Sequence, residues 1–141
     1  MNLVFQTLKA LWSGTRAATA IFYYNWGLFY ARWGQPYRAF WYMNRAVIMN
    51  PNNPKGYYHR GALFLAVGQF ERAILDFSAA IKIDPEYTEA YSNRGLMFTL
   101  IDKDDEAQQD FDRAAQLGAD LATLAKQADQ LKISRGLNEP E

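Results

Sequence analysis

A period of 34 residues runs through most of this sequence and constrains its fold more than any other feature. At five places, residues of a similar kind recur 34 residues apart in three successive units. These residues are Tyr23, Tyr57 and Tyr91; Gly27, Gly61 and Gly95; Ala39, Ala73 and Ala107; Met43, Phe77 and Phe111; and Ala46, Ala80 and Ala114. A fixed period of this length is typical of arrays whose unit is a helix–turn–helix.

Each unit is predicted to consist of two helices. A glycine in the middle of the first helix costs about 1 kcal/mol relative to alanine, which is acceptable where a second helix has to approach closely. Gly34 and Gly68 are suited to ending the first helices of two units. Pro51 and Pro85 end the second helices, because proline restricts the residue before it. The third unit has Ala119 in that place.

The pattern therefore predicts an all-α fold, a solenoid of three helical pairs with a cap at each end. The units span residues 20–53, 54–87 and 88–121. Residues 122–134 are expected to form a C-terminal capping helix, and 135–141 a polar tail. Residues 1–19 are expected to form an amphipathic N-terminal helix or cap, with a break near Gly14. Its apolar stripe consists of Leu3, Val4, Leu8, Leu11 and Trp12.

These residues resemble the tetratricopeptide repeat family. That family has glycine, alanine, alanine and proline at the places occupied here by Gly61, Ala73, Ala80 and Pro85. The resemblance covers about residues 20–121 and recurs in register, and it implies a right-handed α-solenoid with a concave groove. Pro36 and Asp104 stand where the family usually has an aromatic residue, which leaves the turn geometry of the first and third units open but not the fold.

The resemblance also implies which residues line the groove. They are Tyr24, Asn25, Leu28 and Arg32; Lys55, Tyr58, His59, Ala62 and Leu65; and Glu89, Ser92, Asn93, Leu96 and Thr99. Some relatives bind the acidic C-terminal tails of chaperones with a clamp of two lysines, two asparagines and one arginine. The corresponding places here hold Tyr24, Leu28, His59, Glu89 and Asn93. We therefore expect a different ligand.

Two further places change together from unit to unit. One holds Trp26, Arg60 and Arg94, and the other holds Tyr42, Asp76 and Asp110. The joint exchange predicts an ion pair between the two helices of the second unit and of the third. In the first unit it predicts an aromatic contact instead.

The second helix of the first unit carries an unusual set of aromatic and basic residues. They are Tyr37, Arg38, Trp41, Tyr42 and Arg45. Tyr37, Trp41 and Arg45 share one helical face, which is expected to lie on the convex side. Two interpretations remain: residues 1–12 fold back and cover this patch, or the patch binds a protein or an anionic membrane surface.

Charge is unevenly distributed along the chain. Residues 1–70 contain seven basic residues and no acidic ones, a net charge of +7, whereas residues 71–141 contain eight basic and fifteen acidic residues, a net charge of −7. Of the 22 aromatic residues, 17 lie in the first half. This asymmetry indicates a partner for at least one half.

Residues for catalysis or for holding a cofactor are scarce. There is no cysteine and only one histidine, His59. No phosphate-binding loop occurs, and the acidic cluster around Asp104 lacks the spacing of a calcium loop. The sequence therefore predicts no enzyme, no metal site and no cofactor. The uncharged run at residues 17–31 is also shorter than the roughly 20 residues that a membrane-spanning helix needs.

We therefore expect a non-catalytic protein-interaction module: an adaptor, an assembly factor or a small subunit of a larger complex. Its partner is expected to be a protein, with a membrane-protein complex as one candidate. The alternative is a peripheral membrane factor held by the N-terminal helix and the Tyr37, Trp41 and Arg45 face. Nucleic-acid binding and self-association are further alternatives. The expected location is the cytoplasm, or the cytoplasmic face of a membrane.

Overall fold

The computed structural model describes the backbone of residues 2–136 and the side chains of residues 14–134. Every regular element in this part of the chain is a helix. The helices are α1 (Asn2–Arg32), α2 (Pro36–Met49), α3 (Pro54–Ala66), α4 (Phe70–Ile83), α5 (Thr88–Leu100), α6 (Asp104–Gln116) and α7 (Leu121–Gly136). The prediction of an all-α fold is confirmed.

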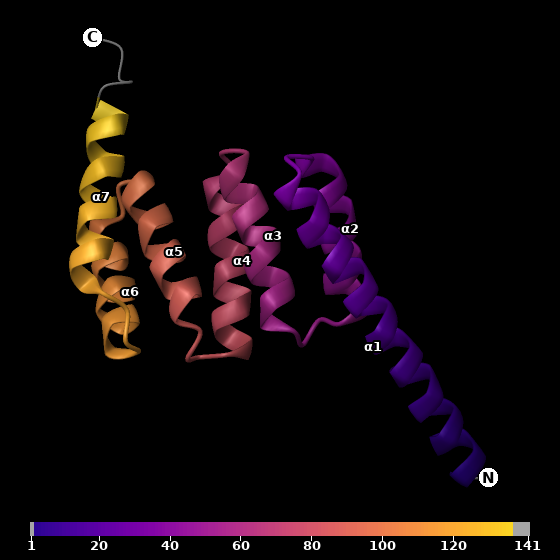
Figure 1. Cartoon of the computed structure of the whole chain (residues 1–141). Helices are drawn as coiled ribbons and strands as arrows, with labels where there is room; N and C mark the ends of the chain where they lie inside the picture. The colour runs from indigo at the N-terminus through magenta and orange to yellow at the C-terminus, as the bar shows by residue number, and fades with distance from the viewer. Residues whose placement is uncertain (1, 137–141) are drawn as a thin grey trace.

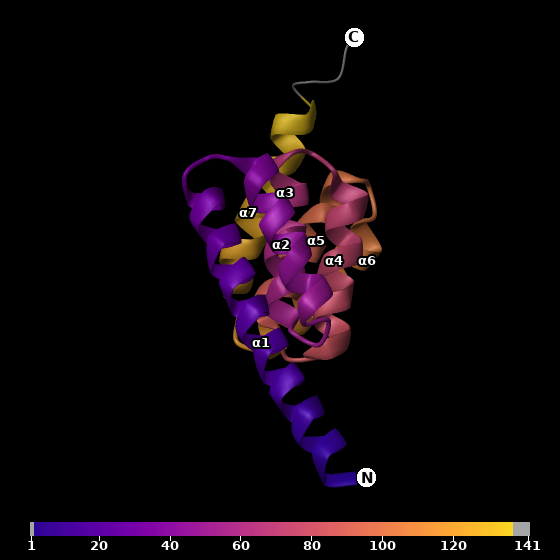
Figure 2. The ribbon, with the colours of Figure 1, turned by 90° about the vertical axis from the view of Figure 1, so that its right-hand side faces the viewer.

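The helices stack as successive pairs to form a solenoid (Figure 1). α1 packs on α2, α3 on α4 and α5 on α6, and the pairs are joined through α2–α3 and α4–α5 contacts. α7 packs on α5 and α6 at the end of the array. Viewed from the α1 end, α1 and α7 lie on one side and α4 and α6 on the other (Figure 2). The side formed by α1, α3, α5 and α7 is called the odd-helix face below.

The repeated glycines lie where the two helices of a unit come closest. A Cβ added at Gly61 would lie 2.9 Å from Cε1 of Phe77, and one at Gly95 would lie 2.6 Å from Cε1 of Phe111. The facing alanine of the second helix, Ala73 in the second unit, is fully buried. The close approach expected from the sequence is therefore present.

Residues in the left-handed backbone conformation end the first helix of each unit. Gly34 has φ 65° and Gly68 has φ 74°. The third unit has no glycine in this turn, and Asp102 takes the conformation instead, with φ 59°. Aspartate tolerates this region better than most side chains, so the third turn keeps the geometry of the other two despite its different sequence.

Arg60 of α3 joins three helices. Its Nε and Nη2 groups donate to the two carboxylate oxygens of Asp76 in α4 at 2.7 and 2.8 Å. Its Nη1 group donates to Oδ1 of Asn44 in α2 at 2.7 Å. The predicted ion pair within the unit is confirmed. The bond to the preceding unit was not predicted from the sequence.

The third unit has the same arrangement of bonds, and the first unit has the predicted aromatic contact in its place. Arg94 of α5 pairs with Asp110 of α6 at 2.7 Å and donates to Oγ of Ser78 in α4 at 2.9 Å. In the first unit, Trp26 stacks on Tyr42 with ring centroids 6.1 Å apart. Both predicted contacts are therefore confirmed.

α1 differs from its expected form. It continues without a break through Gly14, so the predicted interruption is absent. Its first half extends away from the array and does not fold back over α2 (Figure 1). Arg16 fixes its direction, because Nε and Nη2 donate to the carbonyl oxygens of Met49 and Ile48, each at 3.0 Å. The predicted apolar stripe of residues 3–12 lies outside the described side chains.

Candidate interaction surfaces

Four rings lie in a row across the odd-helix face, and this set is called the aromatic row below. Tyr24 of α1 contacts His59 of α3 with ring centroids 5.5 Å apart, and His59 contacts Tyr58 at 5.1 Å. Tyr58 contacts Tyr87, which precedes α5, at 5.0 Å. The side-chain amide of Asn93 donates to the hydroxyl oxygen of Tyr58 at 2.9 Å. The structure therefore brings together four predicted groove residues from α1, α3 and α5.

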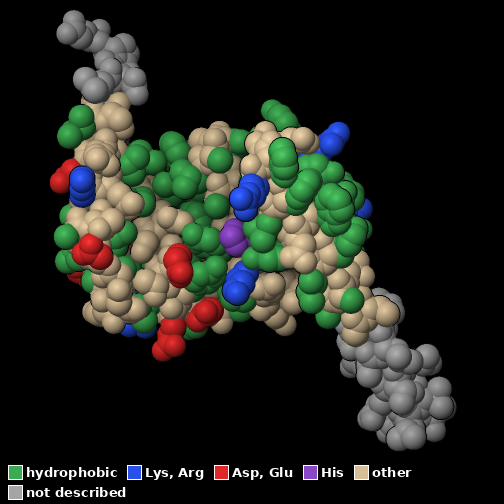
Figure 3. Space-filling model, in the orientation of Figure 1, with side chains coloured by type: hydrophobic (Ala, Val, Ile, Leu, Met, Phe, Trp, Pro, Cys, Tyr) green, Lys and Arg blue, Asp and Glu red, His purple; other side chains and the backbone are tan. Residues whose placement is uncertain are grey.

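The rings of this row are uncharged at neutral pH. Burial, followed by the positive charge of Lys55, lowers the pKa of His59 below its ordinary value of 6.5. Burial is also the main cause that raises the pKa of Tyr58 and of Tyr87 above the ordinary tyrosine value. Formal charge on this face comes from neighbouring side chains. Figure 3 shows basic ones on the N-terminal half of the face and acidic ones toward α5 and α7.

The other predicted groove residues divide into exposed and packed ones. Asn25, Arg32 and Lys55 are exposed. Leu28 packs against the core of the first unit. Thr99 is 3% exposed and its hydroxyl donates to the carbonyl oxygen of Gly95, so its predicted place on the surface is wrong. Its hydroxyl completes a bond within α5 and is not available to a ligand.

The predicted patch on α2 is partly a surface and partly a packing layer. Tyr37 is 91% exposed and Trp41 is 52% exposed. The guanidinium carbon of Arg45 lies 5.5 Å from the centre of the Trp41 ring, within range of a cation–π contact. Tyr42 instead stacks on Tyr30 with centroids 5.2 Å apart. Tyr37, Trp41 and Arg45 therefore form the accessible part, whereas Tyr42 holds the first helical pair together.

Tyr37 and Trp41 also line a groove between α2 and the second unit, at the end of α3 and the start of α4, with a volume of about 580 Å³. Its other lining residues are Pro36, Phe40, Asn44, Leu63, Phe64, Val67, Gln69 and Arg72. Because this groove combines residues of two units, the pattern of a single helix did not reveal it.

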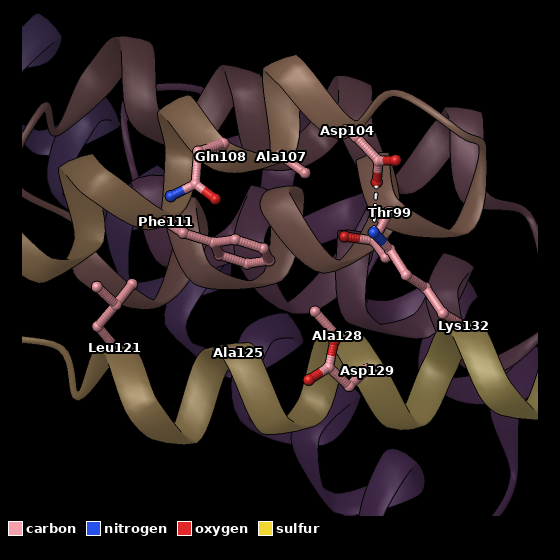
Figure 4. Close-up of a pocket in the computed structure, with 10 residues that line it drawn as sticks. All are labelled: Thr99, Asp104, Ala107, Gln108, Phe111, Leu121, Ala125, Ala128, Asp129 and Lys132. Carbon is pink, nitrogen blue, oxygen red and sulfur yellow. Dashed lines mark ion pairs between the residues drawn. The ribbon is translucent and has the colours of Figure 1, made fainter.

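A second cavity lies along the seam between α6 and α7 and has a volume of about 290 Å³ (Figure 4). The ring of Phe111 points from α6 toward α7. An ion pair between Lys132 and Asp104, at 2.9 Å, bridges the two helices. The seam is a place where α7 packs loosely, because its main contacts are with α5.

The comparisons with known proteins fit this geometry. The family model of the tetratricopeptide repeat matches residues 54–87, the predicted second unit. No curated protein matches the sequence. Among solved structures, the Arabidopsis OM64 TPR domain is 25% identical with a TM-score of 0.75, and the alignment covers 84% of this chain and 98% of that one.

The chain has the fold of a tetratricopeptide-repeat solenoid.

Two other similar solved structures concern peptide binding. The solenoid is 27% identical to the second TPR of Spaghetti (RPAP3) bound to the HSP90 peptide SRMEEVD, with a TM-score of 0.70 and coverage of 73% of this chain and 95% of that one. It is 26% identical to YrrB, a TPR protein with an unusual peptide-binding site, with a TM-score of 0.70 and coverage of 77% and 57%.

Within residues 14–134, no group of three His, Asp or Glu side chains could hold a metal ion. No helix in the part searched is long and apolar enough to cross a membrane.

Tyr87 is the functional candidate that sequence reasoning missed. It belongs to none of the repeated aromatic places, since the corresponding residue one unit earlier is Asn53. The turn before α5 brings its ring to Tyr58. Only the three-dimensional structure reveals that the aromatic row extends to the loop.

Proposed function

We propose that this repeat solenoid is a non-catalytic adaptor or assembly factor that binds an extended segment of a partner protein across its odd-helix face. The aromatic row is the observation that carries this proposal. Its rings are uncharged and come from α1, α3 and the loop before α5, and they are bordered by exposed polar groups. Such a surface suits a peptide, because aromatic rings supply contact area at little conformational cost and polar groups orient the chain.

The charges beside the row indicate which way the segment lies. Lys55 and Arg32 are exposed on α3 and α1, whereas Glu89 is exposed on α5. We expect the acidic end of the segment toward α1 and α3. The similar structure that holds an HSP90 peptide supports peptide binding as the mode of interaction. The clamp positions differ here, so the peptide SRMEEVD itself is expected to bind weakly.

A displayed library of random peptides tests this proposal. Peptides selected on the intact chain are measured by titration calorimetry against the intact chain and against a Tyr24→Ala, His59→Ala variant. We expect at least about tenfold weaker binding to the variant, the loss that corresponds to about 1.4 kcal/mol. Tyr37→Ala, on the other side of the molecule, is the matched control. Equal binding to all three proteins would remove the aromatic row from the proposal.

A second candidate function is attachment to a membrane surface through α1 and the α2 patch. The observation that favours it is the exposure of Tyr37 and Trp41 beside Arg45, since aromatic and basic residues together suit anionic lipid headgroups. Flotation with vesicles rich in anionic lipid, at low salt, tests the intact chain against one that lacks residues 1–13. If neither protein floats, this candidate is eliminated.

A further inference from the structure

One side of α1 is a row of exposed aromatic residues that the peptide-binding proposal does not use. Phe22, Trp26, Phe29 and Trp33 are 53, 38, 46 and 67% exposed. Their spacing of four, three and four residues places them on one side of the helix. Consecutive ring centroids are 6.1, 5.3 and 5.9 Å apart. This row is called the aromatic stripe below.

The places of Phe22 and Phe29 are covered in the later units, whereas the place of Trp33 is not, since its counterpart Val67 is 48% exposed. One period further on, Gly56 is buried and Leu63 is 8% exposed. Two periods on, Ala90 is 0% and Met97 is 2% exposed. Three periods on, in α7, the residue that corresponds to Phe22 is Leu124, which is 6% exposed. In each case the preceding helices of the array cover them.

The part of the aromatic stripe at Phe22 and Phe29 is therefore the stacking face of the first unit, and it is exposed in the described part of the chain. A Cβ added at Gly56 would lie 3.2 Å from Val47 of α2, which shows how closely a helix packs on this face in the second unit. At the first unit the face is larger and wholly aromatic. An apolar surface of this kind on a folded protein indicates an interaction site, and the repeat geometry indicates that its occupant is a helix.

We propose that the occupant is α1 of a second copy of this chain, packed antiparallel. α1 has 31 residues, so it is about 46 Å long at 1.5 Å per residue. Its first half stands clear of the array (Figure 2), and in its second half the side that bears the stripe is exposed. The helical periodicity of the sequence places Val4, Leu8 and Leu11 in line with the aromatic stripe.

Antiparallel pairing matches the two halves of the helix. With the twofold axis near Ala18, residues 4, 8 and 11 of one copy face residues 33, 29 and 26 of the other. Aliphatic positions then lie opposite aromatic ones, whereas a parallel arrangement would place the bulky rings against each other. The same residues take part on both copies, as a twofold interface requires.

The centre of α1 suits a close crossing of two helices. Gly14, Thr15, Ala17 and Ala18 are small and exposed. The remaining large residue there, Arg16, is bonded to the end of α2. The distance between two packed helices depends on the side chains at the contact, so small residues permit a short one. The stripe itself contains no charged residue, so pairing opposes no like charges along it.

Charge also favours a second copy over a membrane surface. Helices that lie on membranes carry many basic residues along their polar side. α1 has only Lys9, Arg16 and Arg32 in 31 residues. One of these, Arg16, is bonded to carbonyl oxygens of α2.

Sedimentation equilibrium of the intact chain tests the pairing. We expect a dimer for the intact chain and for the control Tyr37→Gln, and a monomer for the double variant Phe29→Gln, Trp33→Gln. All three changed side chains are exposed, and an unchanged circular dichroism spectrum verifies that each variant is folded. A monomeric intact chain at every concentration would overturn the proposal, as would a dimer that the double variant retains.

Disulfide cross-linking tests the direction of pairing, because the chain has no cysteine of its own. Antiparallel pairing brings position 18 of one copy to position 18 of the other and keeps the two copies of position 29 far apart. Under oxidation, Ala18→Cys should therefore form a covalent dimer and Phe29→Cys should remain a monomer. Cross-linking of Phe29→Cys, or none for Ala18→Cys, would contradict the antiparallel arrangement.

Discussion

Removal of the Arg60 side chain should leave the buried carboxylate of Asp76 without its ion-pair partner. Asp76 is 6% exposed and accepts two of the hydrogen bonds that Arg60 donates. We expect Arg60→Ala to lower the free energy of unfolding by about 2–3 kcal/mol, measured by urea denaturation, because the carboxylate loses its partner in a poorly hydrated site.

The double variant Arg60→Ala, Asp76→Ala provides the control. It should lose less stability than the two single variants added together, because it leaves no unpaired charge behind. The charge-reversed pair Arg60→Asp, Asp76→Arg should recover part of the loss. Strictly additive losses would mean that the two side chains do not interact in solution.

His59 gives the stability of the solenoid a dependence on pH. Burial and then Lys55 lower its pKa in the folded chain below the ordinary value of 6.5. As the pH falls through 6.5, the unfolded chain takes up a proton that the folded chain still excludes, so the free energy of unfolding falls. We expect a larger drop in melting temperature between about pH 7.5 and about pH 5.5 for the intact chain than for His59→Gln.

The carboxyl groups are the same in both proteins, so their effect cancels in this comparison. An equal drop in the two proteins would show that His59 is as hydrated in the folded chain as in the unfolded one.

At single positions, the sequence predicts contacts within a unit better than contacts between units. The pairs Arg60–Asp76 and Trp26–Tyr42 were predictable because both members change together along the 34-residue period. The bond from Arg60 to Asn44 was not, because asparagine and serine fit many surroundings. The exposure of Phe29 was also missed, since it depends on whether another helix packs on that face of α1 and not on the residue itself.

At the scale of helical pairs, the two glycine contacts differ in how easily they can adjust. A Cβ at Gly95 would meet the rigid ring of Phe111 at 2.6 Å, whereas one at Gly27 would meet the flexible end of Met43 at 2.9 Å. Alanine gains about 1 kcal/mol of helix propensity over glycine. We therefore expect Gly27→Ala to change stability by less than about 1 kcal/mol, and Gly95→Ala to cost about 1–3 kcal/mol by overpacking.

Chemical denaturation of both variants, with the intact chain as reference, measures the difference. Equal losses would indicate that the backbone of the second helix, which lies 3.3 Å from the added Cβ in both units, sets the cost rather than the side chain.

Among the helices, α1 departs most from the prediction. The expected break at Gly14 rested on the weak helix propensity of glycine, but a cost of about 1 kcal/mol is small beside the hydrogen bonds of a 31-residue helix. The third turn also differed in sequence and not in shape, because Asp102 adopts the conformation that glycine has elsewhere. Local propensity therefore ranks below the periodic pattern as a guide to this fold.

At the scale of the whole solenoid, α7 closes the exposed face of the third unit. Leu124 is 6% exposed and belongs to the cluster around Phe111. We expect Leu124→Ala to lower the free energy of unfolding by about 2–3 kcal/mol, the lower part of the range for buried leucines, because the neighbouring seam lets the site relax.

Lys132→Ala is the matched control on the same helix. Its ion pair with Asp104 is exposed, so its removal should change stability by less than about 1 kcal/mol in the same denaturation experiment. Similar losses for the two variants would mean that the apolar contact of α7 contributes little.

The bonds from Arg60 to Asn44 and from Arg94 to Ser78 also bear on cooperativity. In a nearest-neighbour description, the stability of a repeat array is the sum of terms for each unit and terms for each junction. Each arginine contributes to both terms at once, since the guanidinium that braces its own unit also bonds to the unit before it. Opening one unit therefore weakens its neighbour. Each of the two junctions carries one such arginine, so the three units are expected to unfold as one cooperative block.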